Sequence, residues 1–60
     1  MTNKDIKNKM YELYQALQER NDESYNEFYN ALYILWALRM IPDKQWEMIK
    51  KFDTELAEMF

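Results

Sequence analysis

Residues 25–42 of the chain read YNEFYNALYILWALRMIP, and this stretch decides the fold. Its aromatic and aliphatic side chains recur at intervals of three and four residues, which places them on one face of a helix. The main face consists of Tyr25, Phe28, Tyr29, Leu32, Leu35 and Trp36. Pro42 ends the helix, because the residue before a proline is pushed out of the helical conformation. The sequence therefore predicts a helix over residues 25–40.

The opposite side of this helix is polar at its start and apolar after residue 31. The polar residues on it are Asn26, Glu27 and Asn30, and the apolar residues that follow are Ile34, Ala37, Leu38 and Ile41. A helix that is apolar on every face must be covered on every face. Two neighbouring helices cover two sides at best, so we expect a partner chain to cover the rest.

We predict the residues of this partner interface from their position on the second half of the helix. Tyr33 lies farthest from the centre of the main face, and tyrosine is common at binding surfaces. Arg39 either bonds the last helical carbonyls or a nearby acid, or it anchors the interface. The predicted interface consists of Tyr29, Tyr33, Ile34, Trp36, Ala37, Leu38, Arg39 and Ile41.

A first helix is predicted over residues 3–20. Thr2 and Asp5 have the spacing of a capping box at its start. Its apolar stripe consists of Ile6, Met10, Leu13 and Leu17. Asn21 tolerates the left-handed conformation that ends many helices. Ser24 and Glu27 then have the spacing of a second capping box, which begins the next helix.

A third helix is predicted over residues 42–59, because proline suits the first position of a helix. Its stripe consists of Ile49, Phe52, Leu56 and Met59, with Trp46, Met48 and Phe60 at the margins. The fold class is therefore all-α, a single domain of three helices over residues 1–60 with the second helix central. A domain of this length buries only about 60% of its unfolded surface. We therefore expect dimerisation to complete the bundle.

Composition excludes several kinds of site. The 60 residues include no Cys, no His and no Gly, so thiolate nucleophiles, histidine bases and glycine-rich phosphate loops are impossible. Asp22, Glu23 and Glu27 form an acidic group in a polar turn, where a solvated cap is expected in preference to catalysis or metal binding. We predict no enzyme activity, no catalytic residue, no cofactor and no metal.

The chain carries a net charge of −3, which disfavours nucleic acid as a partner because binding needs clustered cations. Its longest apolar run, residues 31–41, is shorter than the roughly 20 residues that span a membrane. We expect a cytoplasmic protein without a membrane partner.

The sequence thus predicts a small non-catalytic protein-binding module, a homodimer that regulates or inhibits another protein. Asn, Lys, Ile, Tyr, Phe and Met, which have AT-rich codons, make up 28 of the 60 residues. This bias suggests a phage or another mobile element as the source. One alternative is a DNA-binding transcriptional regulator that uses the turn between the second and third helices. Another is a structural subunit of a larger hetero-assembly.

Overall fold

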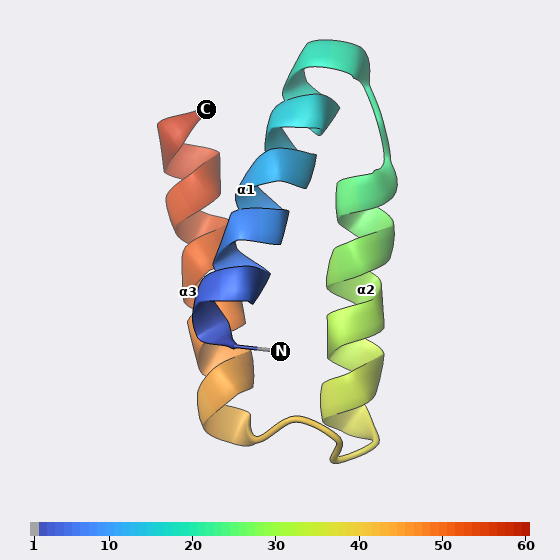
Figure 1. The fold of residues 1–60 in the computed structure, drawn as a ribbon, viewed down its shortest axis with the longest axis vertical. Coiled ribbons are helices and arrows are strands. Elements are labelled where there is room, and N and C mark those ends of the chain that lie inside the picture. The colour runs from blue at the N-terminus through green and yellow to red at the C-terminus, as the bar shows by residue number, and fades with distance from the viewer. Residues whose placement is uncertain (1) are drawn as a thin grey trace.

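The computed structural model of the chain describes residues 2–60, and within them it contains three α-helices and no strand. The helices are α1 (Asn3–Arg20), α2 (Ser24–Ala37) and α3 (Asp43–Met59). They run up, down and up, so α2 is antiparallel to both of the others (Figure 1). All three pairs of helices contact each other in a body of 33 × 18 × 17 Å. The predicted all-α, three-helix architecture is confirmed.

The helix α1 has the predicted bounds and the predicted capping box. The Asp5 backbone N–H donates to the Thr2 hydroxyl at 3.1 Å, and the Thr2 backbone N–H donates to the Asp5 carboxylate at 3.4 Å. Asn21 ends the helix in the left-handed conformation, with φ 54°. Its N–H donates to the Leu17 carbonyl at 3.1 Å, so the chain can leave the helix without a glycine.

The predicted capping box of Ser24 and Glu27 is wrong, because α2 has Glu23 as its N-cap residue and no side-chain cap hydrogen bond. One oxygen of the Asp22 carboxylate accepts from the Ser24 backbone N–H at 3.0 Å and from the Ser24 hydroxyl at 2.6 Å. The Ser24 hydroxyl is thus bonded to Asp22 in the turn before the helix, where an aspartate commonly bonds the backbone two residues later. These hydrogen bonds, the hydroxyl one first, lower the pKa of Asp22 from its ordinary value.

The helix α2 ends at Ala37, three residues before the predicted end. The Arg39 N–H donates to the Trp36 carbonyl and the Met40 N–H donates to the Leu35 carbonyl, at 2.9 and 2.8 Å. This pair of bonds is the Schellman motif, and it requires Arg39 to adopt a left-handed φ of 63°. A continued helix would carry the guanidinium on the core face, whereas the early end leaves it in an exposed turn.

The core lies along the line where the three helices meet. Ile6 and Met10 of α1 and Ile49 and Leu56 of α3 are fully buried. The other buried apolar residues are Ala16, Tyr25, Leu32 and Trp46. The predicted stripes are thus confirmed except at Met59, which is exposed, and at Leu35, which is half-buried outside the core cluster.

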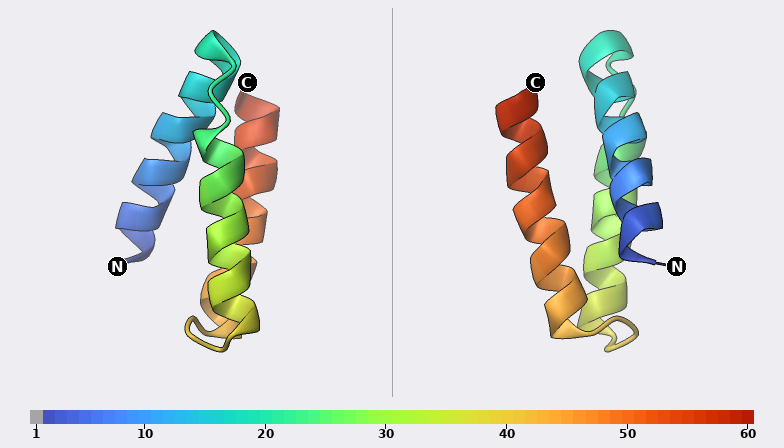
Figure 2. Two further views of the ribbon diagram at one scale, coloured as in Figure 1. Left: turned by 90° about the vertical axis from the view of Figure 1, so that its right-hand side faces the viewer. Right: turned by 60° about the vertical axis from the view of Figure 1, so that its left-hand side comes forward.

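The expectation that the second helix is central is wrong. Figure 2 shows the three helices from two further directions. The helix α1 packs more extensively against α2 and α3 than those two pack against each other. As a result α2 is covered along one face only, and its other face remains open.

Candidate protein-binding surface

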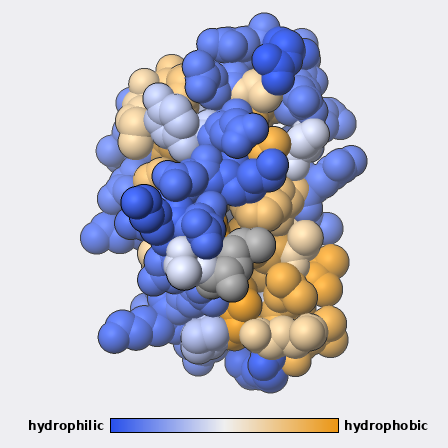
Figure 3. Space-filling model, viewed as in Figure 1, coloured by the Kyte–Doolittle hydropathy of each residue, from blue (hydrophilic) through white to orange (hydrophobic). Residues whose placement is uncertain are grey.

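The C-terminal half of α2 and the turn after it carry an exposed apolar surface. We call it the outward patch, and it consists of Tyr33, Ile34, Ala37, Leu38 and Met40. Leu38 is 65% exposed and Met40 is 69% exposed. Figure 3 shows apolar side chains gathered over the lower end of α2, next to a mostly hydrophilic surface over α1. Contiguous apolar surface of this kind marks interaction sites.

Helical geometry explains why these side chains gather. Ala37 and Leu38 lie three and four residues after Ile34, so all three are on one side of the helix. The early end of α2 then brings Met40 into the same exposed region. Met40 was not among the predicted interface residues, although helical spacing places it three residues after Ala37 and seven after Tyr33.

The structure divides the eight predicted interface residues into two groups. Five are exposed: Tyr33, Ile34, Ala37, Leu38 and Arg39. The other three, Tyr29, Trp36 and Ile41, are partly buried and pack against the core cluster. The first group is therefore available to a partner, and the second group contributes to the packing of the bundle.

The edge of the outward patch carries one charge of each sign. An Arg39 nitrogen lies 3.5 Å from the Asp43 carboxylate, and both side chains are at least 75% exposed. The Trp36 indole N–H donates to the same carboxylate oxygen at 2.7 Å. The Arg39 guanidinium also lies 6.0 Å from the centre of the Trp36 ring, within the range of a cation–π contact. Asp43 thus links the start of α3 to the end of α2 through an ion pair and a hydrogen bond.

An unbroken series of aromatic contacts connects the patch to the opposite end of the molecule. Trp36 stacks on Trp46 with ring centres 5.5 Å apart, and Tyr14 meets Tyr25 edge to face at 4.8 Å. The complete series is Tyr11, Phe60, Tyr14, Tyr25, Tyr29, Trp46, Tyr33 and Trp36. Most of these rings stabilise the bundle, as expected, while Tyr33 is half-exposed.

A hydrogen bond to a charged carboxylate lies within this series of aromatic rings. The Tyr25 hydroxyl donates to the Asp53 carboxylate. Burial raises the pKa of the Tyr25 hydroxyl, and the hydrogen bond to Asp53 and the charge of that carboxylate raise it further. Burial, and then the charge of Asp53, also raise the pKa of Tyr29.

The sequence pattern contained a signal for this pair that the sequence analysis missed. Asp53 lies four residues after Ile49 and three before Leu56, both fully buried. A carboxylate within an apolar stripe must find a hydrogen-bond donor. Tyr25 supplies that donor from the facing helix.

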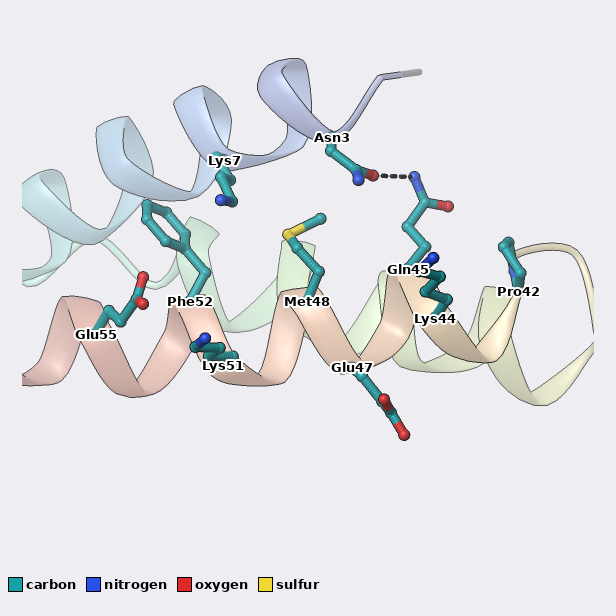
Figure 4. Close-up of a pocket in the computed structure, with 10 residues that line it drawn as sticks. All are labelled: Asn3, Lys7, Pro42, Lys44, Gln45, Glu47, Met48, Lys51, Phe52 and Glu55. Atoms are coloured by element: carbon teal, nitrogen blue, oxygen red, sulfur yellow. Dashed lines mark hydrogen bonds between the residues drawn. The ribbon is translucent and has the colours of Figure 1, made fainter.

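A groove of about 620 Å³ lies between α1 and α3 (Figure 4). Asn3 and Gln45 join its two sides through a hydrogen bond of 3.0 Å. Its charged lining is mixed, with Lys7, Lys44, Lys51, Glu47 and Glu55. The Lys7 ammonium lies 5.5 Å from the centre of the Phe52 ring, which occupies one end of the groove.

Other kinds of site find little support in the described part of the chain. Residues 2–60 bring together no group of three metal-ligating side chains. The surface of α3, on which DNA recognition would depend, carries Lys44, Lys50 and Lys51 against Asp43, Glu47, Asp53, Glu55 and Glu58. None of the three helices is long and apolar enough to cross a membrane, as far as residues 2–60 are concerned.

Comparison of the chain with protein-family models, with curated proteins and with solved structures finds no match.

Proposed function

We propose that the protein is a non-catalytic protein-binding module that forms a homodimer through the outward patch. The observation that carries this proposal is the exposure of Leu38 and Met40, each more than 60% accessible beside Ile34. Covering large aliphatic side chains stabilises an assembly by about 25 cal/mol for each Å² removed from water.

A second copy of the chain suits the patch chemically. The patch itself carries no charge, so two copies meet without repulsion. Its edge carries Arg39 and Asp43, both exposed. In a two-fold dimer the same surface is used twice, so it must complement itself. A pair of opposite charges beside a neutral apolar centre meets that condition.

The size of the chain also supports a second copy of the chain as the partner. A standard interface covers about 800 Å² of each partner, which is less than a fifth of the accessible surface of 4429 Å². Dimerisation at that scale would leave the polar surface of α1 free for another protein. We therefore assign the dimer to the class of small regulators or inhibitors that act by binding.

Sedimentation equilibrium of the full chain tests this proposal. We expect the mean mass to rise with concentration from 7.5 kDa toward twice that value. The double variant Ile34→Glu/Leu38→Glu should remain at the mass of one chain, because each dimer would bury four carboxylates. Both positions are exposed, so the fold should persist by circular dichroism.

Met59→Glu is the matched control, since Met59 is 58% exposed but lies outside the patch. It should associate as the unaltered chain does. A chain that stays at 7.5 kDa up to near-millimolar concentration overturns the homodimer. Loss of association in Met59→Glu, with none in the double variant, moves the interface to the other end of the molecule.

A further inference from the structure

A second groove, of about 410 Å³, lies between α2 and α3. It is lined by three tyrosines and two asparagines of α2 and by one carboxylate of α3: Tyr25, Tyr29, Tyr33, Asn26, Asn30 and Asp53. The tyrosines lie one helical turn apart, so their rings line the groove along its length. This volume falls within the range of small-ligand sites.

The lining of this groove has a negative electrostatic character. Asp53 is its one charged residue, and no lysine or arginine of residues 2–60 forms an ion pair with that carboxylate. Aromatic rings add partial negative charge on their faces, and asparagine side chains offer carbonyl oxygens. The groove between α1 and α3 differs, because three lysines outnumber two glutamates in its lining.

Asp53 is also held in place. The Tyr25 hydroxyl donates to one oxygen of the carboxylate, and the other oxygen is left without a hydrogen-bond partner among residues 2–60. A carboxylate oxygen accepts hydrogen bonds most strongly from a charged N–H donor. A fixed carboxylate beside tyrosine rings is therefore suited to an ammonium or guanidinium group.

We infer that this groove binds a basic side chain, the guanidinium of an arginine or the ammonium of a lysine, from a protein partner. Tyr33 lines the groove and also belongs to the outward patch. The groove therefore borders the proposed dimer interface, and a protein that binds beside the second copy can reach it. Asp53 supplies the charge, the asparagine amides supply further acceptors, and the tyrosine rings contact the aliphatic stem.

NMR titration of the ¹⁵N-labelled full chain tests the inference. The probes are N-acetyl-arginine amide and N-acetyl-lysine amide, with N-acetyl-citrulline amide and N-acetyl-norleucine amide as their neutral counterparts. We expect the cationic probes to cause saturable shifts at Asn26, Tyr29 and Asn30 with millimolar affinity, and the neutral probes to cause none. The titration is run at a protein concentration at which the chain sediments as a single copy, so that the result does not depend on self-association.

Asp53→Asn removes the charge and keeps an oxygen that can accept from Tyr25. It should weaken binding of the cationic probes at least about tenfold. Tyr33→Ala removes one wall of the groove at an exposed position and should weaken binding about threefold. Glu55→Gln, in the other groove, is the matched control and should bind as the unaltered chain does.

Two results would overturn the inference. One is equal shifts with charged and neutral probes, or no saturable shift with either cation. The other is unchanged affinity in a folded Asp53→Asn variant. If that variant fails to fold, the charged and neutral probes on the unaltered chain, together with Tyr33→Ala, decide the question.

Discussion

The two faces of the C-terminal half of α2 are both apolar, but only one of them is covered. Leu32 on the inward face is 3% exposed, whereas Leu38 on the outward face is 65% exposed. The same residue type, six positions apart, is thus a core residue in one place and a surface residue in the other. The difference shows which apolar residues stabilise the monomer and which are available to a partner.

The difference arises from the arrangement of the helices. The helix α1 packs against both α2 and α3, and the inward face of α2 is the face that these contacts bury. No fourth helix of the described chain reaches the outward face (Figure 1). Substitutions on the inward face should therefore act on folding, and substitutions on the outward face should act on association.

The largest effect is expected for Leu32→Ala. Truncating a fully buried leucine costs about 3 kcal/mol through lost burial and the cavity left behind. In a domain of this size that lowers the melting temperature by about 15 °C. Thermal unfolding followed by circular dichroism at low protein concentration measures it. Leu38→Ala is the matched control and should change the monomer by less than about 0.5 kcal/mol; equal losses in the two variants would contradict the distinction between the faces.

A smaller loss of stability is expected for Tyr25→Phe. This variant keeps the buried ring and removes the hydroxyl bonded to Asp53. A hydrogen bond to a charged group contributes about 2 kcal/mol. Urea unfolding at neutral pH measures this loss. Tyr33→Phe is the control, because its hydroxyl has no hydrogen bond to the rest of residues 2–60 and its removal should change little.

The same variant has a pH signature. The pKa of the Tyr25 hydroxyl is raised in the folded chain above its ordinary value of 10.0. The folded state then holds a proton that the unfolded state releases, so the unaltered chain loses stability as the pH rises above about 10. Tyr25→Phe should lose less stability as the pH rises above about 10. The loss that remains comes partly from Tyr29, whose pKa is also raised. An identical alkaline loss in both proteins would contradict the role of Tyr25.

The smallest expected effect is a gain in stability at the turn between α2 and α3. Arg39 holds a left-handed φ of 63°, which costs a side chain with a Cβ about 1–2 kcal/mol. Arg39→Gly should therefore stabilise the monomer by about 0.5–1 kcal/mol, after the greater entropy of an unfolded glycine is counted. Asn21→Gly should gain less, because asparagine tolerates this conformation. Urea unfolding of both variants measures the difference, and a destabilised Arg39→Gly would show that the pair with Asp43 outweighs the strain.

Local sequence signals predicted much of this fold. The spacing of Ile6 and Met10 located the core face of α1, and Thr2 with Asp5 located its start. Pro42 located the break before α3. The exposure of Ile34 and Leu38 followed from the side of α2 that they share with Asn26 and Asn30.

Three features were missed, two of them local and one between distant segments. The Ser24 hydroxyl bonds Asp22 in the turn instead of Glu27 in the helix. The early end of α2 depends on a left-handed arginine, a conformation that arginine rarely adopts. The bond between Tyr25 and Asp53 joins residues 28 positions apart, and helical periodicity alone does not pair them.

The central claim is that the outward face of α2 is covered by a second copy of the chain. Isotope-filtered NMR on a mixture of ¹³C-labelled and unlabelled protein tests it most directly, since it detects contacts between copies alone. We predict intermolecular signals from the methyl groups of Ile34, Leu38 and Met40. Intermolecular signals confined to Met59 and the Phe60 ring, or none at concentrations where the outward patch should be occupied, would contradict the claim.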